Sequence, residues 1–120
     1  MDMIDRKFNF KLPSSSKIIN YKYYSMGGYF DAKILIDTQA VESIKKSLVE
    51  YFKNEYIIKN DDEIPNFQNS CDWWDLDKKN IESCYNIMIF GENEFSPKTR
   101  DVWAFITNEK DGQCYLYISY

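Results

Sequence analysis

The sequence predicts an α+β fold in which one antiparallel sheet carries a single amphipathic helix on one face. Three patterns support this prediction: segments in which apolar and polar residues alternate, one segment with helical periodicity, and turn residues between the strands. The predicted order of elements is ββαβββ, which is typical of an antiparallel sheet with its helix on one side. The 120 residues are expected to form a single domain, residues 1–120.

The first two strands are predicted on either side of a glycine turn. Lys17–Tyr24 alternates as a half-buried strand does. Its apolar side would hold Ile19, Tyr21 and Tyr23. Tyr29–Ile36 continues the period, with Asp31 and Lys33 on the polar side. Its apolar side would hold Phe30, Ala32, Ile34 and Ile36. Ser25-Met26-Gly27-Gly28 predicts a hairpin turn, because adjacent glycines accept positive φ.

Residues 38–54 are predicted to form the helix. Asp37 and Thr38 are both good N-caps. Apolar residues then recur at helical spacing, and polar residues occupy the opposite face. The side chains expected to pack against the sheet are Val41, Ile44, Leu48 and Phe52.

The rest of the chain returns to strands. Tyr56–Lys59 is a candidate short strand, and Ile81–Phe90 alternates weakly. Residues 99–108 are apolar on both sides, which is typical of a central strand covered on both faces. Glu109-Lys110-Asp111-Gly112 predicts a turn, and Gln113–Tyr120 the last strand.

The composition argues against an enzyme. Histidine is absent, which removes the commonest general base and the commonest metal ligand. No serine–histidine–aspartate or cysteine–histidine site can be built from this chain. We expect no catalytic residues, no metal site and no cofactor.

The three cysteines, Cys71, Cys84 and Cys114, are expected to be small buried hydrophobic residues. The alternative is a Cys71–Cys84 bridge in an exported form. The opening residues lack the apolar run of a signal peptide, so the expected location is the cytoplasm. Export is the alternative if a signal segment has been removed.

Residues 61–77, the acidic-aromatic segment, are the most unusual part of the chain. They contain six acidic residues and no basic residue, with tryptophans among them. Large aromatic side chains anchor many interfaces, and carboxylates around them attract a basic partner. The expected partner-binding residues are Asp61, Asp62, Glu63, Asp72, Trp73, Trp74, Asp75 and Asp77. In an extended segment Trp73 and Trp74 would point to opposite sides, one into the core and one toward the partner.

Two other interpretations of this segment stay open. It can be a solvated acidic loop whose two tryptophans both fold inward and cover the core. It can also bind calcium through Asp72, Asp75 and Asp77, although the spacing does not match an EF-hand loop.

Binding to nucleic acid is not expected, because the net charge is −4 and the lysines form no large cluster. Insertion into a membrane is not expected either, since no apolar run is long enough to cross one.

Cys71-Asp72-Trp73-Trp74-Asp75, followed by strands that end at Tyr120, resembles small uncharacterised bacterial proteins with a Cys-x-Trp-Trp-Asp segment. Some of those proteins are exported or lipid-anchored, and the resemblance spans residues 65–120. It implies no activity. In size, acidity and lack of catalytic groups the chain is also similar to bacterial immunity proteins, which bind and block a partner toxin.

These observations favour a non-enzymatic bacterial interaction domain. We expect an inhibitor or immunity-type protein that binds a basic partner through the acidic-aromatic segment. The alternative is an exported or surface-associated domain that binds a small ligand between helix and sheet, in a pocket lined by aromatic residues.

Overall fold

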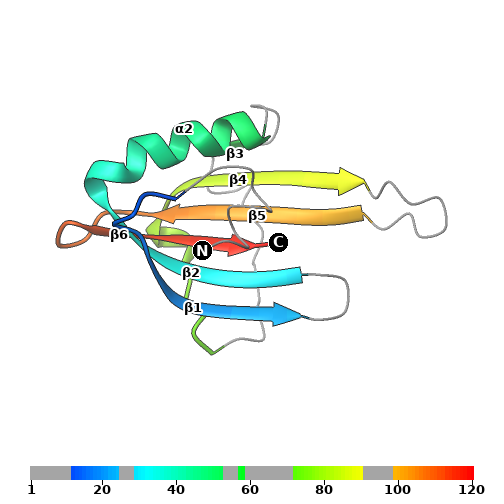
Figure 1. Cartoon of the computed structure of the whole chain (residues 1–120), viewed down its shortest axis with the longest axis horizontal. Helices are drawn as coiled ribbons and strands as arrows, with labels where there is room; N and C mark the ends of the chain where they lie inside the picture. The colour runs from blue at the N-terminus through cyan, green and yellow to red at the C-terminus, as the bar shows by residue number, and fades with distance from the viewer. Residues whose placement is uncertain (1–11, 25–28, 53–56, 59–71, 91–98) are drawn as a thin grey trace.

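The computed structural model describes residues 12–24, 29–52, 57–58, 72–90 and 99–120, and it confirms the predicted α+β fold (Figure 1). One sheet runs in the spatial order β1-β2-β6-β5-β4-β3, with neighbouring strands antiparallel. The strands are β1 (Lys17–Tyr24), β2 (Tyr29–Asp37), β3 (Ile57–Ile58), β4 (Ile81–Phe90), β5 (Thr99–Thr107) and β6 (Gln113–Ser119).

The pairing of β2 with β6 organises the sheet. The predicted pairing of β1 with β2 is confirmed, and residues 25–28 between them lie outside the described residues. The last strand, β6, inserts between β2 and β5, so the final strand of the chain is central in the sheet. The candidate strand at residues 56–59 is confirmed as the two-residue β3, which pairs with β4.

The predicted helix begins as a short 3-10 turn. The side chain of Asp37 accepts a hydrogen bond from the backbone N–H of Gln39, and it thereby caps η1 (Thr38–Ala40). The α-helix itself, α2, runs from Val41 to Phe52. Residues 53–54 of the prediction lie outside the described residues.

Helix α2 covers one face of the sheet, on the side where β3 and β4 lie (Figure 1). Ile44 is 2% exposed and Leu48 is 0% exposed, while Val41 is partly buried against the same core. Burying these side chains removes apolar surface from water and holds the helix on the sheet. The side chain of Phe52 lies outside the described residues. Across from α2 the sheet presents the predicted row on β2 and matching rows on β5 and β6: Phe30, Ala32, Ile34, Ile36, Val102, Ala104, Ile106, Cys114, Leu116 and Ile118.

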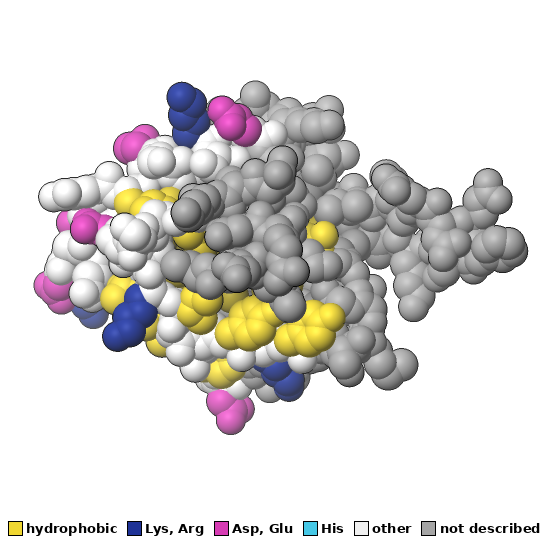
Figure 2. Space-filling model, in the orientation of Figure 1, with side chains coloured by type: hydrophobic (Ala, Val, Ile, Leu, Met, Phe, Trp, Pro, Cys, Tyr) yellow, Lys and Arg dark blue, Asp and Glu magenta, His cyan; other side chains and the backbone are white. Residues whose placement is uncertain are grey.

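Strand β1 differs from the expectation. The three residues predicted for its apolar side are exposed: Ile19 is 42%, Tyr21 38% and Tyr23 47% accessible. The tyrosines share the helix side of the sheet, because they lie opposite Ala32 and Phe30 in the register. However, β1 is the strand at the far end of the sheet from α2, and Figure 2 shows hydrophobic surface in the region where Figure 1 draws β1 and β2. The register also shifts between Ile18 and Asn20, which is typical of a bulge. Ile18, opposite Ile34, therefore packs against the helix-side core in the place predicted for Ile19.

The opposite face of the sheet holds a second core, so the prediction of a central strand covered on both faces is confirmed for β5. A row of paired residues crosses this face from β2 to β4: Lys33, Tyr117, Phe105 and Cys84. Phe105 and Cys84 are fully buried, and Trp103 stacks on Phe105 with ring centroids 5.7 Å apart. The polar side of β2 therefore faces a covered surface, and not solvent.

Cys84 and Cys114 are free and buried, as expected of small hydrophobic residues. Burial raises the pKa of Cys84 to about 12, so the thiol stays protonated at neutral pH. Cys71 lies outside the described residues, and Cys84 forms no bridge to it. Among the helices that the structure describes, none has the length and apolar character needed to cross a membrane.

Candidate functional site

The described part of the acidic-aromatic segment, residues 72–77, lies on the second face of the sheet. Trp74 is 8% exposed and packs edge-on against Phe105 and Tyr117, with ring centroids 6.4 and 5.2 Å away. Trp73 is partly buried against the same cluster. Edge-to-face packing of this kind stabilises an aromatic cluster beyond the area that it buries.

The two indoles do not point to opposite sides. Their ring centroids are 6.0 Å apart, and both contact the second core. The prediction assumed an extended segment, but Asp72 and Trp73 form a turn, and the N–H of Asp75 donates to the carbonyl of Trp73 over 3.0 Å. This i to i+2 hydrogen bond reverses the chain locally and brings both rings to the sheet.

The predicted acidic residues fall into two groups. Asp61, Asp62 and Glu63 lie outside the described residues. Asp72, Asp75 and Asp77 are exposed, and Asp75 contacts Lys33 and Tyr117 of the sheet.

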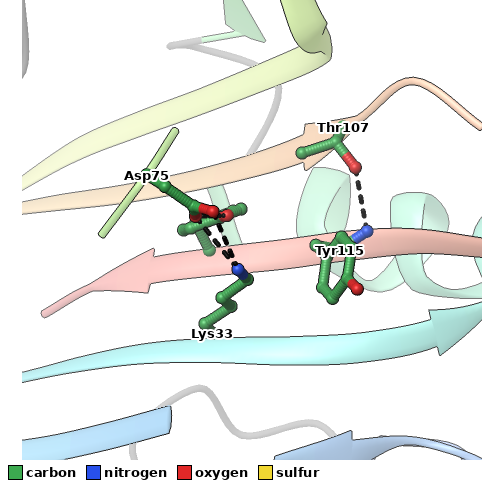
Figure 3. Close-up of polar contacts among 5 residues, drawn as sticks. Lys33, Asp75, Thr107 and Tyr115 are labelled. Atoms are coloured by element: carbon green, nitrogen blue, oxygen red, sulfur yellow. Dashed lines mark hydrogen bonds and ion pairs between the residues drawn. The ribbon is translucent and has the colours of Figure 1, made fainter. Parts of the chain in front are cut away.

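Asp75 joins the segment to the sheet through Lys33 and Tyr117. The ammonium of Lys33 lies 3.0 and 3.2 Å from the two carboxylate oxygens of Asp75 (Figure 3). Tyr117 donates its hydroxyl proton to the same carboxylate. The Lys33 side chain is 14% exposed, whereas that of Asp75 is 63% exposed. Lys33 is therefore held beneath a carboxylate that solvent can reach.

These contacts shift the pKa of the Asp75 carboxyl and that of the Tyr117 hydroxyl in opposite directions. Burial by itself raises the pKa of Asp75, but the hydrogen bonds from Tyr117 and Lys33 outweigh it and hold that pKa below its usual value. Burial and the hydrogen bond to Asp75 raise the pKa of Tyr117 well above its usual value. At neutral pH Asp75 is thus ionised and Tyr117 protonated: the lowered pKa makes the Asp75 carboxylate a weak base, and Tyr117 keeps its proton.

The ammonium of Lys33 also lies over two aromatic rings. Its Nζ is 4.8 Å from the ring centroid of Tyr115 and 5.5 Å from that of Tyr117. The register explains this placement, because Lys33 lies directly opposite Tyr117 and the ring of Tyr115 is on the same face two residues earlier. Asp75, Tyr115 and Tyr117 together form a carboxylate–aromatic cage around a cation, which we call the cage.

The cage opens into a cleft of about 600 Å³ between residues 75–80 and the β5–β6 hairpin. Strand β5 leaves β6 after Ile106, and the N–H of Tyr115 donates instead to the hydroxyl of Thr107 over 2.9 Å (Figure 3). The N–H of Asn108 then donates to the carbonyl of Asn80 over 2.7 Å. This departure of β5 from β6 forms one wall of the cleft.

The cleft is polar and mostly acidic. Its charged lining residues are Lys33, Asp75, Asp77, Glu109, Lys110 and Asp111, and its uncharged lining residues are Leu76, Asn80, Thr107, Asn108, Gln113, Tyr115 and Tyr117. One oxygen of Asp77 accepts the backbone N–H of Lys79 over 3.0 Å. Because Lys33 is paired with Asp75, the lining residues that the structure describes retain three carboxylates against the ammonium of Lys110, and such a cleft attracts cations.

Sequence reasoning missed the residues that complete this site. The alternation places Lys33 only on the polar side of its strand, and it places Tyr115 and Tyr117 in the last strand without indicating a function. Residues 99–108 did indicate this site, because they are apolar on both sides and so predict a sheet that is covered on both faces. In such a sheet the polar side of a neighbouring strand such as β2 is covered as well. The partner of Lys33 could not be predicted, since it lies 42 residues away in the sequence.

The geometry does not favour a calcium site at Asp72, Asp75 and Asp77. Within the residues that the structure describes, no three cysteine, aspartate or glutamate side chains are close enough to hold a metal ion. Asp75 is directed to Lys33 and Tyr117.

Comparison with known protein families, with curated proteins and with solved structures finds no match.

Proposed function

We propose that this chain is a non-enzymatic interaction domain, of an inhibitor or immunity type, that binds a basic protein partner. The binding surface is the acidic-aromatic segment together with the cleft beside it. The observation that carries the proposal is the cage, because a lysine ammonium already lies there against one carboxylate and two tyrosine rings. A surface with this chemistry is complementary to a basic side chain.

The tryptophans give this surface an anchor and a support. Trp74 is buried against Phe105 and Tyr117 and holds the segment on the sheet. Trp73 is only partly buried, so part of its indole is available to a partner. Exposed Asp72 and Asp77 flank it and would speed the docking of a positive partner.

The ionisation of the site supports binding over catalysis. Three titratable groups of the cleft lining, Lys33, Asp75 and Tyr117, are engaged with one another. The low pKa of Asp75 and the high pKa of Tyr117 oppose proton exchange near neutral pH.

We propose a cytosolic location for this interaction. The thiols of Cys84 and Cys114 are free and buried, which is usual in a reducing compartment. The alternative function, a small ligand bound between helix and sheet, gains less support, because Ile44 and Leu48 fill the described part of that interface and the cleft lies on the other face.

The proposal is tested by comparative capture from cells that carry the gene. Wild type, Trp73→Ala and the double variant Asp72→Lys/Asp77→Lys are immobilised in parallel, and the retained protein is identified and then purified for affinity measurement. We expect one basic protein whose affinity falls by about 2 kcal/mol with Trp73→Ala, the magnitude of an interface hot spot. The double variant should mainly slow association, and this effect should shrink in high salt.

Glu50→Lys is the matched control, because it reverses an exposed charge on α2, on the opposite side of the sheet. It should leave the affinity nearly unchanged. A retained protein that is acidic, or one that binds all of these variants equally well, would overturn the proposal.

A further inference from the structure

We propose that the cage formed by Asp75, Tyr115 and Tyr117 is a receptor for a basic side chain of the partner, with arginine preferred, and that Lys33 occupies it while the partner is absent. This inference deepens the proposed function and rests on it. The partner's basic group and the ammonium of Lys33 would compete for the same place in the cage.

The present occupant shows what the cage binds. The Nζ of Lys33 lies 3.0 Å from Asp75 Oδ1 and 4.8 Å from the ring centroid of Tyr115. A carboxylate and an aromatic face act together on the same positive charge, and neither contact depends on the chain to which the ammonium belongs. Another cation of the same size can make the same contacts.

The cage can be reached from outside. The Asp75 side chain is 63% exposed, and the cage opens into the cleft of about 600 Å³, which falls in the size range of ligand sites. Asp77, Glu109 and Asp111 also line the cleft and add negative charge along the route.

Exchange of Lys33 for another cation is feasible. Because the Asp75 side chain is 63% exposed, water screens its ion pair with Lys33, so a competing cation does not face a deep minimum. The flexible four-carbon stem of lysine lets the ammonium move into water. A guanidinium is favoured over a second ammonium, because it is planar, stacks on tyrosine and binds a carboxylate through two N–H groups.

The test uses N-acetyl-arginine amide as the probe and N-acetyl-citrulline amide, its neutral analogue, as the control ligand. Binding is followed by NMR through the amides of Tyr115 and Gln113 and through the side-chain methylenes of Lys33. In wild type we expect the arginine probe to shift the Lys33 methylenes toward their free values, because displacement removes them from the tyrosine ring currents. The citrulline probe should not produce this shift.

Lys33→Ala and Lys110→Ala form a matched pair, since each removes one ammonium from the lining of the cleft. If only charge matters, both variants bind the arginine probe more tightly by the same factor. If Lys33 occupies the cage, Lys33→Ala should bind it at least about fivefold more tightly than Lys110→Ala does, since about 1 kcal/mol of cation–π and ion-pair competition is removed. Equal gains in the two variants would overturn the inference.

Tyr115→Leu keeps the charges and removes one aromatic face. It should weaken binding of the arginine probe severalfold, and unchanged binding would contradict the cage. This variant also keeps the test decisive if Lys33→Ala proves poorly folded.

Failure here is distinguishable from failure of the proposed function. If the arginine probe binds neither wild type nor Lys33→Ala, while a basic partner still binds in a Trp73-dependent way, the cage is not the receptor and the proposed function stands. If the probe displaces Lys33 but no basic partner is retained, the cage binds cations and the proposed function is wrong. Equal binding of the citrulline probe would show a site for neutral polar ligands and would overturn the inference.

Discussion

Lys33 shows how its place in a sheet changes the role of a charged residue. On β2 it alternates with buried Ala32 and Ile34, a pattern that normally places a lysine in solvent. Here the acidic-aromatic segment crosses that face, so the same side chain is 14% exposed and paired with Asp75. The cost of covering the ammonium is offset by the carboxylate and by two tyrosine rings.

Asp75→Asn should flatten the loss of stability in acid. The pKa of Asp75 in the folded protein lies below its unfolded value of about 3.8, so its contribution is present above that pH and is lost as the pH falls through the lower, folded value. Because Asp75 is 63% exposed, solvent screens the effect and it should be small. Urea unfolding between neutral pH and pH ~2 measures it.

Asp72→Asn is the control, since it removes an exposed carboxylate from the same segment. Wild type and Asp72→Asn should lose stability in parallel as the pH falls. A parallel loss in Asp75→Asn as well would mean that Lys33 and Tyr117 do not stabilise the ionised carboxylate.

At the scale of elements, the β5–β6 hairpin joins two internal strands of the sheet and also lines the cleft. Its turn is predicted from the sequence and confirmed: Lys110 and Gln113 exchange backbone hydrogen bonds of 2.9 and 3.1 Å around Asp111 and Gly112. Both central residues have positive φ, 55° and 76°, as the tight hairpin turn with Asp-Gly at its centre requires. Between this turn and Ile106, where the pairing of β5 with β6 ends, the chain bends away from β6, and the N–H of Asn108 donates to the carbonyl of Asn80.

Gly112→Ala should cost about 1–2 kcal/mol of folding free energy, because an alanine is strained at positive φ. No atom lies within 4 Å of the position that the new Cβ would occupy, so the cost comes from the backbone alone. Urea unfolding of the variant measures the loss.

Gly112→Asn tests the reason for that loss. Asparagine visits the left-handed region more readily than alanine, so it should lose less stability. Equal losses in the two variants would show that something other than backbone conformation is responsible.

At the scale of the whole molecule, the sheet is a layer between two different covers. Helix α2 covers one face with aliphatic side chains, and residues 72–77 cover the other with aromatic rings and carboxylates. Helix α2 packs through apolar residues that recur with helical periodicity. Residues 72–77 have no regular periodicity, and they carry charged side chains, so the candidate site lies on the face of the sheet that they cover.

Thermal unfolding of the whole chain should be the same with and without a chelator. The chain has no histidine, the thiols of Cys84 and Cys114 are protonated because burial raises their pKa, and Asp75 is engaged by Lys33. A fall of more than a few degrees in Tm on chelation, reversed by added calcium, would restore the calcium interpretation of Asp72, Asp75 and Asp77.

The sequence by itself determined the positions of the strands and the helix, and it identified the residues that pack between the helix and the sheet. Strand β1, strand β4 and the turn at Asp111 and Gly112 lie where the alternation and the glycine predicted them. The helical spacing of Ile44 and Leu48 identified the buried side of α2. These features depend on neighbours close in the chain, so local patterns contain the necessary information.

Only the tertiary structure decided the order of the strands, the exposure of β1 and the site. Insertion of β6 between β2 and β5 places Tyr117 opposite Lys33, and the segment that crosses this face brings Asp75 to both. The turn at Asp72 and Trp73 directed both indoles to the sheet, against the expectation from an extended segment. Each of these outcomes depends on contacts between residues far apart in the chain, and periodicity, which reports only on the nearest turns and pleats, cannot specify which distant segment will cover a given face.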